Sequence, residues 1–211
     1  MEGSEAMDAD ADATIEMALT EPDKGPNQPA GRSGAGLLLV FAVAGALVAL
    51  SLGIYGRTHV PTGRPLALLI GFTEMTPMKV WLATAGVLLG IFQLVSAAWM
   101  WGRLPAARKM PKVLPLWHRW SGSIAFLATL PVAYHCLWSL GYSTVGARAA
   151  LHSLFGCAFY GAFTTKMLVL RSKALPGWAL PAAGGLLFAL LIGAWATAGL
   201  WYFTQSGVPL R

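Results

Sequence analysis

The stretch LPVAYHCLWSLGYSTVGARAALHSLFGC, residues 130–157, places two apolar runs on either side of one short polar turn. Each apolar run contains one histidine, His135 or His152. A helix needs about 20 apolar residues to cross a bilayer, where lipid offers no partner for unpaired backbone groups. The stretch is therefore typical of the end of one membrane span, a tight turn and the start of the next span.

The composition of the whole chain supports the same interpretation. Of its 211 residues, 56% are hydrophobic and only 11% are charged, which is more apolar surface than a soluble domain could bury. We predict an all-α integral membrane protein whose residues 34–211 form a bundle of five transmembrane helices in a lipid bilayer. The expected spans are residues 34–55, 77–101, 116–140, 148–170 and 178–203.

The charges are divided unevenly between the N-terminal tail and the remainder. Residues 1–33 hold eight of the nine acids and two bases, whereas the remainder holds 13 bases and one acid. The tail lacks aromatic residues and the charged-then-apolar order of a signal peptide, so we expect a disordered acidic segment. The bases of the remainder lie at the ends of apolar runs, so nucleic-acid binding is not expected.

The positions of the basic residues predict an orientation. Four bases lie within residues 103–112 and two within residues 171–173, and both loops share one side of the membrane by helix parity. Bases on the other side are more widely spread. The positive-inside rule therefore favours a multi-pass cell-membrane protein with a cytoplasmic N-terminus.

The two histidines of the opening stretch are expected at matching depth. His135 lies six residues before Gly141 and His152 five residues after Ala147, so each is about 8–9 Å into its helix at a rise of about 1.5 Å per residue. Two imidazoles at one depth can provide the axial ligands of a haem b iron. Two other interpretations stay open: a pair held by simple hydrogen bonds, and a proton relay or another metal site.

A haem between neighbouring helices needs space and cationic partners. Gly156 and Gly161 on the fourth span are small enough to provide space, and Pro131 can bend the third span one turn before His135. Arg148 lies on the same side as the histidine pair, where it could bind haem propionates. The chain has no CxxCH run, so a haem would be held by coordination and packing alone.

Four runs carry a resemblance to known families: WHRWSG (117–122), AYHCLW (133–138), LHSLFG (151–156) and FYGAFTTKMLVLR (159–171). They resemble helices of b-type transmembrane cytochromes and ferric-reductase-like membrane proteins, and also an uncharacterised actinobacterial multi-span membrane family. The likeness covers about residues 80–171. It implies a helical membrane architecture with haem histidines on consecutive helices.

His118 departs from the pattern of the cytochrome families, which usually place two histidines on each of two helices. It lies 17 residues before His135, about 25 Å nearer the opposite face, where the next helix places Lys166 and Met167 rather than a histidine. We therefore expect one haem b. A second haem near His118 is the alternative, and otherwise His118 is interfacial or a partner for haem propionates or quinone.

These observations predict a membrane-bound b-type cytochrome-like electron-transfer component that works with a quinone or a redox protein. The alternative is a non-redox structural or assembly subunit of a larger membrane complex, and a transporter is a third, weaker interpretation. Since no flavin or nicotinamide domain is recognisable, the sequence identifies no particular reaction, and whether the protein is an enzyme stays open.

Overall fold

The computed structural model describes residues 30–64, 69–104 and 110–208, with side chains from Gly34 onward. The chain divides into two units, Met1–Ser33 and Gly34–Arg211, and the second unit holds the helices discussed below. The predicted disorder of residues 1–29 lies outside the described residues. At residues 30–33 the backbone is already helical, so the first helix begins before the predicted boundary at residue 34.

The described part of the chain is all-helical, as predicted, and contains no strand. Five of its helical segments are long and apolar enough to cross a membrane, and their ends differ from the predicted spans by at most three residues. The elements are α2 (Ala30–Thr58), α3 (Met75–Met100), α4 (Leu114–His135) with η1 (Cys136–Leu140), α5 (Ala147–Arg171), and α6 (Ala179–Trp195) with η2 (Ala196–Leu200) and α7 (Trp201–Ser206).

The outer surface of the helices is apolar. Leu39, Leu88 and Leu127 are each about 60% exposed, and many other large apolar side chains are turned outward in the same way. An extensive exposed apolar surface is unfavourable in water but is expected where lipid surrounds the helices. The outward-facing apolar side chains and the lengths of the helices are therefore both consistent with a lipid environment.

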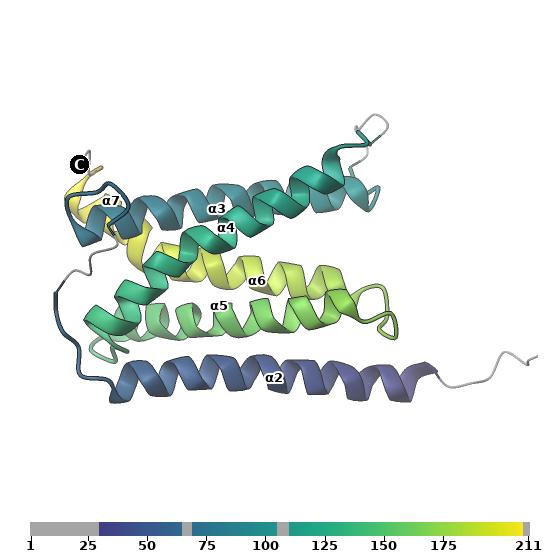
Figure 1. The fold of residues 1–211 in the computed structure, drawn as a ribbon, viewed down its shortest axis with the longest axis horizontal. Coiled ribbons are helices and arrows are strands. Elements are labelled where there is room, and N and C mark those ends of the chain that lie inside the picture. The colour runs from purple at the N-terminus through teal and green to yellow at the C-terminus, as the bar shows by residue number, and fades with distance from the viewer. Residues whose placement is uncertain (1–29, 65–68, 105–109, 209–211) are drawn as a thin grey trace, which may run out of the picture. The chain divides into compact units, whose positions relative to one another are not determined.

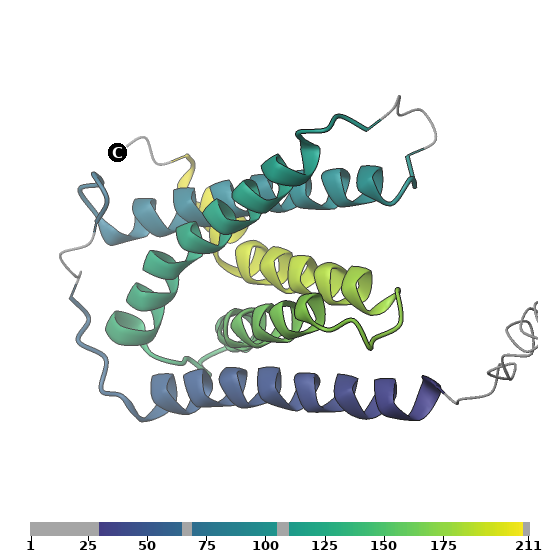
Figure 2. The same cartoon turned by 45° about the vertical axis from the view of Figure 1, so that its right-hand side comes forward.

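The helices pack in pairs. α3 packs against α4, α5 packs against α6, and α3 also meets α6, while α2 runs alongside α5 in both ribbon views (Figure 1, Figure 2). Between α4 and α5 the contact is made by interposed aromatic rings: Phe126 stacks on Phe163 at 3.7 Å, and the Tyr160 hydroxyl donates to Thr129 O at 2.9 Å. These rings keep the two helices apart.

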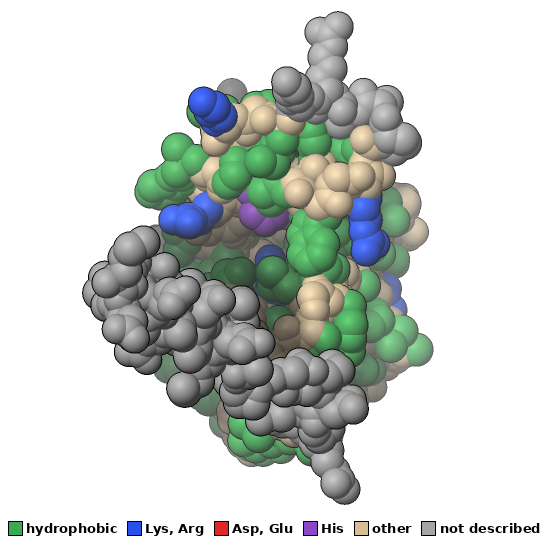
Figure 3. Space-filling view, turned by 90° about the vertical axis from the view of Figure 1, so that its right-hand side faces the viewer, with side chains coloured by type: hydrophobic (Ala, Val, Ile, Leu, Met, Phe, Trp, Pro, Cys, Tyr) green, Lys and Arg blue, Asp and Glu red, His purple; other side chains and the backbone are tan. Residues whose placement is uncertain are grey.

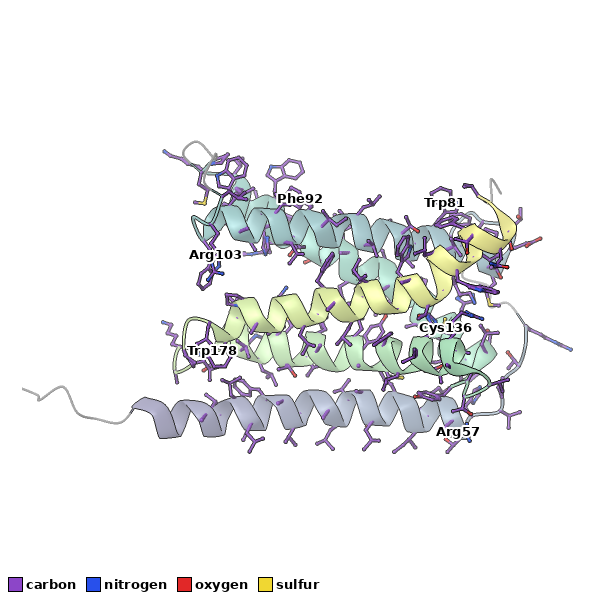
Figure 4. All side chains as sticks on the ribbon, turned by 180° about the vertical axis from the view of Figure 1, so that it is seen from behind. Arg57, Trp81, Phe92, Arg103, Cys136 and Trp178 are labelled. Atoms are coloured by element: carbon purple, nitrogen blue, oxygen red, sulfur yellow. The ribbon has the colours of Figure 1, made fainter. Side chains whose placement is uncertain are left out.

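The two ends of the bundle differ. At one end, here called the cavity end, α2 and η1 finish and α3 and α5 begin. At the other end, here called the loop end, lie the α3–α4 and α5–α6 connections. In Figure 4 the labelled Arg57, Trp81 and Cys136 lie toward the cavity end, and Arg103 and Trp178 lie toward the loop end.

Two wide helical turns lie at the cavity end. Both η1 and η2 are π-helical, and each directly continues an α-helix. The α2–α3 connection contacts η1, because Gly63 N donates to Ser139 O at 3.0 Å. The segment just after η1 is bonded to α2, because Tyr142 N donates to Gly56 O at 2.7 Å. π-Turns inside helices occur frequently at functional sites, so this end of the bundle is a candidate location for a ligand.

Candidate cofactor site

A cavity of about 400 Å³ opens among α3, α4–η1, α5 and α6–η2–α7. Most of its lining is apolar, and its deepest residues on α4 and α5 are Thr129 and Tyr160. Lys79 and Arg148 lie nearer the cavity end of the bundle and also line it. The volume falls within the range of about 300–1,000 Å³ that is typical of small-molecule and cofactor sites.

His152 is a half-buried lining residue of this cavity. Its Nδ1 lies 3.0 Å from Ala194 O and 3.4 Å from Thr197 Oγ1. A carbonyl oxygen can only accept, so Nδ1 carries the hydrogen and Nε2 of the neutral ring keeps a lone pair. No partner of Nε2 is found in the described part of the chain. Histidines that ligate metals have this arrangement, in which one ring nitrogen is fixed by an outward hydrogen bond and the other is free.

His135 has the same tautomer but a different position. Its Nδ1 donates to Pro131 O at 2.8 Å, its ring is fully buried, and its buried Nε2 has no hydrogen-bond partner. Val132 and Cys136, its neighbours along the helix, line the cavity, whereas the His135 ring does not. The structure therefore brings the two histidines to the same end of the bundle without placing both rings on the wall of one cavity.

The two glycines that were expected to provide space behave differently. Gly156 lines the cavity, and a Cβ added there would meet nothing within 4 Å. Gly161 instead lies against Gly45 of α2, where an added Cβ would collide with the Gly45 carbonyl oxygen. The prediction that Gly161 leaves room for a cofactor is thus corrected, because α2 packs against it.

Arg148 is held at the rim of the cavity by two contacts. Its Nη1 donates to Thr197 O at 2.8 Å, and its Cζ lies 3.9 Å from the centroid of the Trp201 ring. A guanidinium over an indole face gains cation–π attraction. The side chain is therefore fixed in position while most of its N–H groups stay available.

His118 lies at the loop end, away from this cavity. Ser96 Oγ donates to Phe92 O at 2.6 Å and so must accept from His118 Nδ1, 2.7 Å away. Gln93 Nε2 donates to Ser121 Oγ at 2.7 Å and to His118 O. His118 therefore belongs to a polar network that joins α3 to α4. Figure 3 views the loop end and shows a hollow in which one histidine side chain is visible.

Sequence reasoning missed several residues of the site. Thr197 and the Ala194 carbonyl, which fix His152, are 45 and 42 residues away from it along the chain, and no local pattern links them. Lys79, Cys136 and Cys157 also line the cavity. A signal existed for Lys79 alone, since a base inside an apolar span is unusual. Within the described residues no group of three or more His, Cys, Asp or Glu could hold a metal ion.

The fold and this site define an all-helical protein whose five long helices are apolar enough to cross a membrane, with an apolar cavity that presents an imidazole and two cations. Residues 38–210 match a family of unknown function, DUF6529, and the chain belongs to that family. No curated protein and no solved structure matches the chain. The resemblance to b-type cytochromes therefore depends on the sequence runs alone.

Proposed function

We propose that this protein is a membrane-embedded, b-type cytochrome-like electron-transfer component that binds one haem in the cavity, where His152 would ligate the iron. The observation that carries the proposal is the free Nε2 of His152, which lines an apolar cavity while Nδ1 is fixed to Ala194 O. An oriented imidazole within a water-excluding apolar shell is what haem ligation requires.

His135 would be the second residue to hold the haem iron in this proposal. Its Nε2 is buried and has no partner, a state that costs free energy unless another group binds it. Haem ligation requires the ring to turn toward the cavity that Val132 and Cys136 line. This segment of α4 is suited to such an adjustment, because Pro131 removes one helical hydrogen bond and the wide η1 turn begins directly after His135.

When bound, haem would supply reversible one-electron chemistry. The chain's own residues orient the imidazoles, exclude water and set the polarity around the site. The working partners in this proposal are a quinone or a redox protein, with the bilayer as the surrounding medium. The location of the cavity toward one end of the bundle favours exchange of electrons at one membrane face.

The test is the reduced-minus-oxidised spectrum of the full-length protein purified from haem-replete cells. We expect a low-spin spectrum with a Soret band and an α-band. His152→Ala should abolish both bands, and His135→Ala should leave a weakened, high-spin species. His118→Ala is the matched control and should leave the spectrum unchanged, because His118 is bonded to Ser96 at the other end of the bundle.

The outcomes separate the two functional classes. A colourless wild-type protein would contradict the cytochrome proposal and favour the structural or assembly subunit. A coloured protein whose spectrum depends on His118 rather than on His152 would place the haem at the loop end. Loss of colour in His152→Ala with an unchanged helix content by circular dichroism would support the proposed site.

A further inference from the structure

Two cations line the cavity, and no acid faces them. Among the described lining residues, Lys79 of α3 and Arg148 of α5 are the basic ones, and none is Asp or Glu. Outside the N-terminal tail the chain has a single acid, Glu74, and neither cation forms an ion pair with it. Charged side chains within membrane spans are costly unless they pair, so such residues by default indicate a functional site.

The positions of these cations define an orientation for a ligand. Lys79 lies five residues into α3, and Arg148 is the second residue of α5, so both are near the membrane face at the cavity end. His152 lies four residues after Arg148, which is one turn deeper along the same helix face. The cavity is therefore cationic at its rim, has an imidazole one turn below, and is apolar beyond.

The N–H groups that Arg148 and Lys79 leave unused also indicate a ligand. Arg148 uses Nη1 for Thr197 O and its face for Trp201, which leaves further N–H groups available. The ammonium group of Lys79 has no partner in the part of the chain that the structure describes. Two cations that face one cavity repel each other, and a shared anionic ligand removes that cost.

We infer that Lys79 and Arg148 bind the acidic groups of an amphiphilic ligand whose apolar body lies beside His152. The inference rests on the proposed function and deepens it: the ligand is haem, and the two cations bind its two propionates. Lys79 is thereby assigned as a cofactor-binding residue, which shares with Arg148 the propionate binding that the sequence suggested for Arg148 alone. Ion pairs of Lys79 and Arg148 with the propionates would turn the propionate edge of the macrocycle toward the membrane surface.

The test compares haem with haem dimethyl ester, in which both carboxylates are neutral. The full-length apoprotein in lipid nanodiscs is titrated with each compound, and binding is followed by the Soret band. We expect wild type to bind haem at least about tenfold more tightly than the ester, since hydrogen bonds to charged groups contribute more than neutral ones. Lys79→Gln should weaken haem binding by about tenfold and leave ester binding unchanged.

Two further variants sharpen this experiment. Lys79→Arg should restore most of the preference for haem, because it keeps the charge. Lys173→Gln, which removes a base at the loop end, is the matched control and should change neither affinity. Since the ester does not depend on Lys79, its unchanged binding also verifies that Lys79→Gln is folded.

The possible failures are distinguishable. Equal affinity of wild type for haem and ester, with no effect of Lys79→Gln, would overturn the assignment of the cations and leave the haem proposal standing. Absence of binding for both compounds would overturn the proposed function and this inference with it. A preference for haem that depends on Lys173 and not on Lys79 would also overturn the assignment.

Discussion

At the scale of single residues, three histidines of the helical bundle share one tautomer. In His118, His135 and His152 the hydrogen is on Nδ1, because each Nδ1 faces an oxygen that must accept. The sequence predicted the helices that carry these rings. It could not predict which way each ring faces, because the acceptors of His118 and His152 come from other helices. The separate neighbourhoods of His135 and His152 are therefore visible only in the structure.

The interhelical bond of His118 can be tested directly. Ser96→Ala removes the acceptor of His118 Nδ1, so we expect the free energy of unfolding to fall by about 1 kcal/mol, typical of a hydrogen bond between membrane helices. The measurement is unfolding in mixed micelles at increasing SDS fraction, followed by circular dichroism. Ser123→Ala is the control, because its hydroxyl is exposed and bonds only to Arg119 O of its own helix. If Ser96→Ala and Ser123→Ala lower the free energy of unfolding equally, the hydrogen bond between Ser96 and His118 contributes no stability of its own.

At the scale of elements, the spans were predictable and the wide turns were not. A run of about 20 apolar residues is required by bilayer thickness, so the helix ends follow closely from sequence. By contrast, η1 and η2 have no periodicity of their own and depend on contacts such as Gly63 N to Ser139 O. The packing of α2 on α5 through Gly45 and Gly161 was missed for the same reason, since no local pattern pairs these glycines.

The contact between α2 and α5 yields a second stability prediction. Gly161→Ala introduces a Cβ that would collide with the Gly45 carbonyl oxygen, so the helices must separate. We expect a loss of about 1–3 kcal/mol, as for other overpacked positions, seen as a lower midpoint of thermal unfolding in detergent. Gly184→Ala is the control, because an added Cβ there meets nothing within 4 Å. If Gly161→Ala unfolds at the same temperature as the control, α2 does not pack closely at this point.

At the scale of the whole chain, an odd number of membrane crossings would place Gly34 and Ser206, the outer ends of the first and last candidate spans, on opposite sides of a membrane. Five candidate spans are present in the described part, and the basic residues of the loop end include Arg103, Lys112, Arg171 and Lys173. The positive-inside rule then predicts that the loop end lies in the cytoplasm and that the cavity, with its proposed haem, lies toward the external face.

Reporter fusions test this orientation. Alkaline phosphatase is active only outside the cytoplasm, so we expect an active fusion after residue 211 and an inactive fusion within the loop at residues 172–177. A fluorescent protein at the same two positions should give the opposite pattern. An active phosphatase at the residue 172–177 loop would reverse the orientation and place the cavity toward the cytoplasm.

The central claim is that the cavity of this bundle holds a haem, and the most direct test is the amount of haem per chain. The full-length protein, purified in detergent from haem-replete cells, is assayed by the pyridine haemochrome method against polypeptide concentration. We expect about one haem b per chain, lost in His152→Ala, because one oriented imidazole lines the cavity. The account would be contradicted by a ratio near zero for folded wild-type protein, if added haem and added haem dimethyl ester also fail to bind.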